Sequence, residues 1–448
     1  MQDYSVKLNK DFSYSLFATW RKQKGFNPIT IVDAEGSYIY TNDNRKILDF
    51  SSQLMCSNLG HKNKRVISAM IEQMNKVAYV SPSFNTPIKD EIAKELKSVL
   101  PENLVKYFFA TSGTEANEAA IKIIRMIKGK EGKTKILSYY NSYHGSTSGS
   151  IQLTGDFRRI AVDSFERSPG FYHIPPPYCY RCPFNLKYPE CNLACVKYAE
   201  YVFKNEGNIG GIFVEPVIGT NGVIVPPKDY LRELKKITEE NDAIFVADEV
   251  MTGWGRTGEW FAVNHFGIKP DILTTAKGIT GAYFPLSLTA VNKEISDYFE
   301  DNYFAHGHTY EAHPLGLAAA VAAIKEYKEK KLVENAKSLS IELGKRLEEF
   351  KEKHKSVGDV RYIGLFAAIE LVKNKEKKTP FNTYNEKIEG KQLVVDKVAR
   401  KALEKGVYVN TWVSHLIIAP PLIITKEELE NGLDAIDEAL YESDKEVE

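Results

Sequence analysis

The chain has 448 residues, and its 59 Lys and Arg side chains are balanced by 59 Asp and Glu side chains. This balance argues against a nucleic-acid partner, because phosphates select a basic face. No apolar run reaches the roughly 20 residues of a membrane helix, and the start at Met1 has no secretion signal. We expect a cytoplasmic protein without a membrane partner.

The N-terminal part contains two hairpin-like runs, 29–32 and 37–40, which hold too little core to fold alone. The middle of the chain repeats a pattern in which a short apolar run leads into a polar or glycine-rich turn. These runs occupy 107–110, 135–140, 211–214, 243–247 and 272–276. Because they do not alternate in polarity, they indicate strands buried on both faces, hence a mostly parallel sheet covered by helices.

After about residue 320 the pattern changes to long amphipathic helices and short strands. The predicted helices are 318–332, 336–354, 392–405 and one from 426, and the predicted strands are 365–372 and 407–410. This mixture is typical of a smaller α+β domain. We therefore predict an N-terminal segment, 1–65, that joins the small domain, a large domain at 66–320, and a C-terminal small α+β domain at 321–448.

Reactive residues follow the apolar runs of the middle region. In open α/β sheets, ligands bind outside the carboxyl ends of the strands, so these residues are expected to converge. Ser112, Gly113 and Thr114 lie between a strand and a helix, where hydroxyls and a helix N-terminus can bind phosphate. The alternative is a plain helix cap, because Ser followed by Glu115 also makes a capping box.

A carboxylate and an amine end two consecutive runs. Asp248 ends a buried strand, so it needs a partner such as a cationic ring nitrogen or a salt bridge within the fold. Lys277 ends the next strand, and a desolvated lysine favours the neutral amine that forms covalent links to aldehydes. Tyr143, before His144, is an aromatic that either stacks on a flat ring or belongs to the core. Together these parts match what pyridoxal 5′-phosphate (PLP) chemistry requires.

The chain resembles the class III (ω-) aminotransferases among the PLP-dependent enzymes of fold type I. The motifs that carry this resemblance stand in the family's order at 112–117, 143–145, 215–217, 248–258, 276–278, 307–310 and 420–422. The resemblance implies a large domain with a seven-stranded, mostly parallel sheet covered by helices, plus a smaller α+β domain. It also implies a homodimer with active sites at the subunit interface.

The resemblance implies roles for individual residues. Lys277 would bind the cofactor covalently and then move the proton, and Asp248 would pair with the protonated ring nitrogen. The other implied cofactor-binding residues are Ser112, Gly113, Thr114, Tyr143, His144, Glu215, Val250 and, from the partner subunit, Thr309. The implied substrate pocket contains Leu54, Met55, Phe84, Thr220 and Asn410.

Two of these pocket positions depart from the family's pattern. Many members that use 4-aminobutyrate or ornithine have a glutamate where this chain has Thr220, and an arginine where it has Asn410. Because both are absent together, the chain lacks an obvious clamp for the acceptor carboxylate. We consider His415, Arg158 and Arg159 as replacements.

Four cysteines, Cys179, Cys182, Cys191 and Cys195, lie in one stretch. Such spacings allow zinc, but we expect no metal, because similar loops in this family need none.

We predict an aminotransferase that moves an amino group from an ω-amino acid or amine, such as β-alanine, taurine or a 4-aminobutyrate-like donor, to a 2-oxo acid. Pyruvate is the first candidate acceptor and 2-oxoglutarate the second. The alternative is an isomerase, because the same fold hosts racemases, epimerases and an aminomutase.

Overall fold

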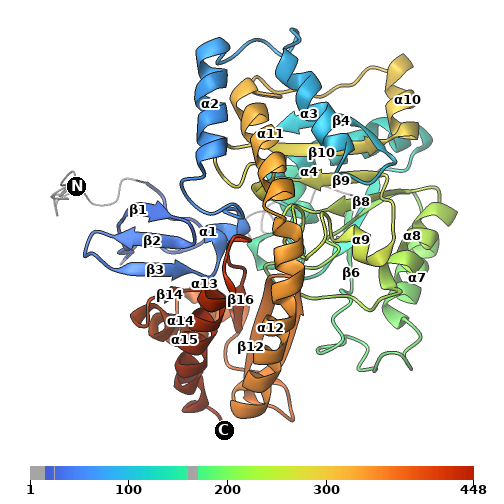
Figure 1. Cartoon of the computed structure of the whole chain (residues 1–448). Helices are drawn as coiled ribbons and strands as arrows, with labels where there is room; N and C mark the ends of the chain where they lie inside the picture. The colour runs from blue at the N-terminus through green and yellow to red at the C-terminus, as the bar shows by residue number, and fades with distance from the viewer. Residues whose placement is uncertain (1–15, 25, 160–169) are drawn as a thin grey trace.

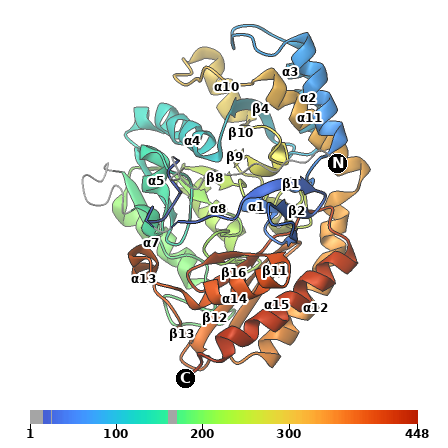
Figure 2. The ribbon, with the colours of Figure 1, turned by 90° about the vertical axis from the view of Figure 1, so that its left-hand side faces the viewer.

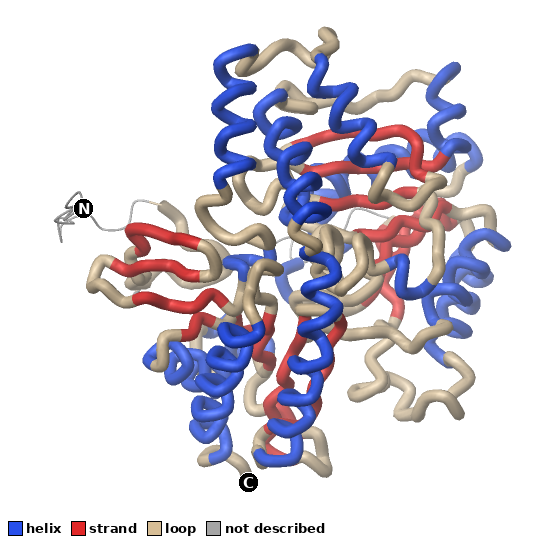
Figure 3. Tube along the Cα trace, viewed as in Figure 1, coloured by secondary structure: helices blue, strands red, loops and turns tan. Residues whose placement is uncertain are grey.

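The computed structural model describes residues 16–24, 26–159 and 170–448. Within these ranges the strands form three sheets, which helices surround (Figures 1 and 3). Among the described residues, no helix combines the length and apolar character needed to cross a membrane.

The largest sheet has the order β4-β10-β9-β8-β7-β5-β6. Its strands are β4 (Leu104–Ala110), β5 (Lys135–Tyr139), β6 (Phe171–Ile174), β7 (Ile209–Val214), β8 (Ile244–Asp248), β9 (Ile272–Thr275) and β10 (Ser287–Asn292). Only β10, among these strands, runs antiparallel to its neighbours, and the other pairs are parallel. Every residue of β7 and β8 is buried, which confirms the predicted mostly parallel sheet.

Helices cover both faces of this sheet, as the alternation of side chains along β8 shows. Val246 packs in one apolar cluster with the isoleucines of α4 (Gly113–Lys128). Phe245 and Ala247 pack in another with the leucines of α8 (Tyr230–Glu240). Since neighbouring strand residues point to opposite faces, α4 and α8 cover opposite sides.

The two smaller sheets join the N-terminal and C-terminal parts of the chain. The first has the order β1-β2-β3-β14, and β14 (Val407–Tyr408) lies parallel to β3 (Lys46–Asp49). The second sheet has the order β11-β12-β16-β15, with β13 beside β12. The remaining strands are β1 (Ile31–Glu35), β2 (Tyr38–Thr41), β11 (Val357–Ile363), β12 (Phe366–Asn374), β13 (Thr379–Pro380), β15 (Asn410–Trp412) and β16 (His415–Ile418). This pairing agrees with a small lobe built from both ends of the chain, whereas the domain boundaries stay a prediction.

Two long helices run beside the large and the small lobe. They are α11 (Pro314–Glu329) and α12 (Leu332–Lys353), and Figure 1 shows them one below the other. The helix predicted at 318–332 begins four residues earlier, because the His313 side chain accepts the N–H of Leu315 and Pro314 occupies the first turn.

The helices α14 (Val394–Glu404) and α15 (Lys426–Asp444) lie below the strands of the large sheet in Figure 2. The other helical segments are α1 (Ser52–Met55), α2 (Lys64–Lys76), α3 (Pro87–Lys97), α5 (Ser148–Leu153), α7 (Ala194–Glu206), α9 (Val263–Phe266), α10 (Lys293–Asp301), α13 (Tyr384–Glu389), η1 (Gly129–Glu131), η2 (Phe157–Arg159) and η3 (Lys277–Ile279).

Candidate active site

The predicted reactive residues lie at the carboxyl ends of neighbouring strands. Asp248 is the last residue of β8, and Lys277 follows β9, the strand hydrogen-bonded to β8. Glu215 comes directly after β7, and Tyr143 follows β5. The fold therefore brings these residues to one edge of the sheet, where α/β proteins bind ligands.

Asp248 is buried and held by three groups. Its Oδ2 atom accepts a hydrogen bond from Asn117 Nδ2 at 2.7 Å and lies 2.8 Å from His144 Nδ1. Its Oδ1 atom accepts the backbone N–H of Val250 at 3.0 Å. Asn117 Oδ1 accepts from Thr274 at 2.7 Å, which fixes the amide so that its NH₂ faces the carboxylate. The sequence motif contains Asn117, but this role depends on tertiary contacts that the motif alone does not reveal.

Lys277 is a partly buried amine in a left-handed backbone conformation, with φ 49°. Its side chain makes no hydrogen bond or ion pair with any residue that the structure describes. Burial lowers the pKa of Lys277, and the charge of Arg158 acts in the same direction. Strained, desolvated lysines of this kind occur at functional sites.

Lys277 lines a cavity of about 280 Å³ together with the start of α4. Ser112 caps this helix: its hydroxyl accepts the Glu115 N–H at 3.3 Å, and the Glu115 carboxylate accepts the Ser112 N–H at 3.1 Å. The capping box is thus present. It leaves the N–H groups of Gly113 and Thr114 without intrahelical acceptors, so they remain available to an anion.

The donor set fits PLP. The α4 N-terminus can hold a phosphate, Asp248 can pair with a ring nitrogen, and Lys277 can bind an aldehyde. Gly113 packs against Val250, because a Cβ atom at residue 113 would lie 2.8 Å from Val250 Cγ1. The helix start and the strand end therefore form the two sides of one narrow cradle.

Glu215 supports the loops beside this cradle. Its carboxylate accepts the N–H of Tyr143 at 2.8 Å and that of Gly219 at 2.9 Å. Burial raises the pKa of Glu215 to about 7. His144 contacts Asp248 and lies fully buried. Glu215 therefore acts on the site through the Tyr143 and Gly219 loops, and His144 acts through Asp248.

The predicted substrate residues fall into two groups. Met55 is buried and packs in a cluster with Met251, and the Thr220 hydroxyl lies 3.4 Å from the Met251 sulfur. The half-buried Asn410 donates to the carbonyl of Gln53 at 2.9 Å.

The second group is exposed on the single chain. Leu54 is 66% exposed and Phe84 is 64% exposed. Thr309 is also exposed, and its carbonyl accepts a hydrogen bond from the Tyr79 hydroxyl at 2.8 Å. Among the described residues, none of these three lines the Lys277 cavity, although Leu54 lies two residues before Cys56, which does.

Arg158 is the candidate carboxylate clamp that lies nearest to the predicted cofactor residues. Its guanidinium stacks on the Tyr143 ring with 3.8 Å between Cζ and the ring centroid. The Nε and Nη2 atoms donate to Asp156, whereas Nη1 donates to no acceptor among the described residues. His415 is engaged with Glu370 and the Trp412 carbonyl, and Arg159 contacts His173.

The four clustered cysteines line one small cavity, and all cysteines of the described chain are free thiols. Within the described ranges, no group of three or more His, Cys, Asp or Glu side chains is arranged to hold a metal ion.

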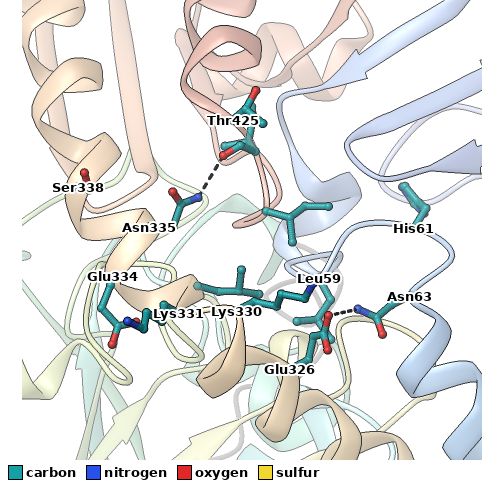
Figure 4. A pocket seen from close by; sticks show the side chains of 13 residues that line it. Leu59, His61, Asn63, Glu326, Lys330, Lys331, Glu334, Asn335, Ser338 and Thr425 are labelled. Atoms are coloured by element: carbon teal, nitrogen blue, oxygen red, sulfur yellow. Dashed lines mark hydrogen bonds between the residues drawn. The ribbon is translucent and has the colours of Figure 1, made fainter.

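A larger pocket of about 770 Å³ lies elsewhere, between α11, α12 and the segment that follows β16. Two of its polar side chains bond within the protein: Asn63 donates to Glu326 (Figure 4), and Asn335 donates to the Leu422 and Ile424 carbonyls. It shares no lining residue with the Lys277 cavity.

Comparison with known proteins gives matches along nearly the whole chain. Residues 20–440 match the profile of the aminotransferase class-III family. The sequence is 35% identical to a leucine/methionine racemase of Thermococcus litoralis over 422 residues, 93% of this chain and 91% of that protein. It is 32% identical to a putrescine–pyruvate aminotransferase of Pseudomonas aeruginosa over 433 residues, 94% of this chain and 92% of that protein.

A solved structure is similar over the same extent. Taurine:2-oxoglutarate aminotransferase from Bifidobacterium kashiwanohense, in complex with PLP and glutamate, superposes with a TM-score of 0.92 at 35% identity, covering 97% of each chain.

Proposed function

Because the chain belongs to the class III family of PLP-dependent aminotransferases, we propose that it transfers an amino group from an ω-amino acid or amine to a 2-oxo acid. β-Alanine, taurine and 4-aminobutyrate-like compounds are the proposed donors. Pyruvate is the first proposed acceptor and 2-oxoglutarate the second, in a ping-pong reaction. The observation that carries the proposal is the position of Asp248 and Lys277 at the ends of two paired strands.

We assign each residue of the site a separate role in this reaction. PLP, when bound, supplies an electron sink for breaking a bond at the amine-bearing carbon. Lys277 has a lowered pKa and, in the described part of the chain, no hydrogen-bond or ion-pair partner, so it can take a proton from that carbon and return it. Asp248 is positioned by its hydrogen bonds to pair with the ring nitrogen, and Gly113 and Thr114 present N–H groups to the phosphate.

Arg158 is the proposed partner of the substrate acid group. It stands over the Tyr143 ring, and its Nη1 group donates to no acceptor within the ranges that the structure describes. Its charge also reaches Lys277, whose pKa it lowers. A carboxylate or sulfonate bound there would be near the reacting amine, which favours donors that carry an acid group at the far end.

We also propose a homodimer. The exposed Phe84 and Thr309 are implied site residues from the partner subunit, and neither lines the Lys277 cavity of its own chain. A second copy packed over these residues would bring them to its site and cover their apolar surface.

The visible absorption spectrum of the purified protein tests this proposal. We expect a cofactor band that shifts when β-alanine is added without an oxo acid and returns when pyruvate is added. The Lys277→Ala variant should hold PLP only by non-covalent contacts and show neither change. A wild-type protein with no band after reconstitution with PLP would refute the proposal.

An isomerase is the second candidate, and the 35% identity to a racemase is the observation that favours it. A racemase needs no acceptor. Incubation with L-leucine alone in deuterated water separates the two: an aminotransferase stops after one turnover, whereas a racemase accumulates D-leucine labelled at the α-carbon.

A further inference from the structure

The loop that follows Glu215 carries an asparagine that the proposed chemistry does not use. Asn221 is 2% exposed and lies in a tight turn, in which the Gly222 and Val223 N–H groups both bond to the Gly219 carbonyl. Its side chain makes three hydrogen bonds, all to residues distant in sequence. Its position is therefore determined by tertiary contacts rather than by the turn alone.

The hydrogen-bond partners fix the orientation of the Asn221 amide. The Trp412 indole N–H can only donate, and it donates to Asn221 Oδ1 at 2.8 Å. The Tyr384 hydroxyl donates to the same oxygen at 3.3 Å. The NH₂ group therefore faces the other way and donates to Asp156 Oδ2 at 3.0 Å.

Asp156 is the residue that holds Arg158. Its carboxylate accepts from the Arg158 backbone N–H at 2.9 Å and from the guanidinium, while the guanidinium lies over the rings of Tyr143 and Trp412. Asn221 thus links the Asp156–Arg158 pair of the large lobe to Trp412 and Tyr384 of the small lobe. No other residue of the described chain bonds to both Asp156 and Trp412.

We propose that Asn221 is a positioning residue that sets the affinity for the acid group of the substrate by orienting Arg158 through Asp156. The inference rests on the proposed function, because it concerns how that reaction selects acidic substrates. It predicts that changes at residue 221 alter the KM of amine substrates that carry an acid group and leave amines without an acid group nearly unaffected.

The Asn221→Asp variant gives a test with a pH signature. When protonated, the new carboxyl group can still donate to Asp156, as the amide does. When ionised, it places one carboxylate 3.0 Å from another, which disfavours the native arrangement. The charged and titratable groups that face this position are Asp156, Arg158, Tyr384, Lys387, Arg361 and His415.

We expect the β-alanine KM of Asn221→Asp, relative to wild type, to rise at least tenfold between pH 6 and pH 8.5, with propylamine kinetics changing less than threefold. Inhibition by propionate, the amine-free analogue of β-alanine, should weaken in parallel, which is a binding readout independent of turnover. Asn221→Ala should raise the β-alanine KM at all these pH values.

Asn141→Asp is the matched control, because the Asn141 side chain also bonds to Tyr384, at 3.2 Å, but to no carboxylate of the described residues. It should show no such pH dependence. Equal effects of Asn221→Asp on β-alanine and propylamine, or a pH profile like that of Asn141→Asp, would overturn the inference. If the wild-type protein itself showed no transamination, that result would instead refute the proposed function.

Discussion

Two adjacent carboxylates at the end of β8 have different surroundings and therefore different behaviour. Asp248 is held by the Asn117 amide, His144 and the Val250 N–H. Glu249 points into the protein, where it accepts hydrogen bonds from the Thr252 hydroxyl and the Val263 N–H. The contacts of Asp248 fix its orientation, whereas burial raises the pKa of Glu249.

Glu249 gives the fold a dependence on pH. Burial raises its pKa from 4.5 to about 7. Between these values the folded chain retains a proton that the unfolded chain has lost, so stability falls as pH rises. We expect this single group to remove up to roughly 3 kcal/mol between pH 4.5 and 7.

The Glu249→Gln variant removes this titration and keeps both contacts, because an amide can accept from Val263 and donate to the Thr252 hydroxyl. Urea unfolding at fixed protein concentration, from pH 5 to pH 8, should show a smaller loss of stability for the variant than for wild type. Parallel curves for the two proteins would contradict the assignment.

The sequence predicts the charged side chains of the site better than it predicts the amide side chains. Asp248 and Lys277 stand out in the sequence because Asp248 ends an apolar strand and Lys277 is the first polar residue after the next strand. Asn117 and Asn221 do not, because an amide is ordinary in a helix start or a turn. Their roles depend on which residues the fold brings opposite to them.

At the level of elements, the close approach between α4 and the end of β8 determines the shape of the cradle. A Gly113→Ala substitution would place a methyl group 2.8 Å from Val250 Cγ1. Overpacking of this kind costs about 1–3 kcal/mol. We expect PLP affinity to fall roughly tenfold or more, measured by equilibrium dialysis of the reconstituted protein.

Gly129 at the other end of α4 provides the control. A Cβ atom there meets nothing within 4 Å, and the backbone is right-handed helical. Gly129→Ala should leave PLP affinity unchanged and the fold as stable or slightly more stable. Equal losses of affinity in both variants would show that the effect is not local to the cradle.

Five strands of the large sheet, β4, β5, β7, β8 and β9, were predictable because each contains a short, mostly apolar run, as expected when both faces are covered. No such run predicted β6 or β10, and β10 contains Ser287, Thr289 and Asn292. The edge strand β4 is the exception: Val105 and Lys106 are exposed, and the strand extends three residues before the predicted run. Neither the pairing of β3 with β14 nor its register could be predicted from the sequence. The two segments lie about 360 residues apart, and only two residue pairs join them.

At the scale of the whole molecule, we expect the second copy of the proposed dimer to cover an apolar stripe on α2. Ile67, Ile71 and Met74 are all exposed and lie three or four residues apart, hence on one side of the helix. Figure 1 shows α2 at the outer edge of the large lobe, with α11 on its inner side. The exposed Tyr79 and Phe84 follow on the next segment, so the stripe continues toward implied site residues.

We expect the wild-type chain to be a dimer in solution and Ile71→Glu to dissociate it, because a buried unpaired carboxylate is strongly disfavoured in an apolar interface. Light scattering after size exclusion, at micromolar protein, measures the mass. Ile341→Glu is the matched control, since Ile341 is 78% exposed on α12, which has no other exposed large apolar side chain in the described structure. Dissociation should also lower PLP retention, because Thr309 would no longer reach the partner's site. An Ile71→Glu protein that remains dimeric, or an Ile341→Glu protein that dissociates equally, would place the interface elsewhere.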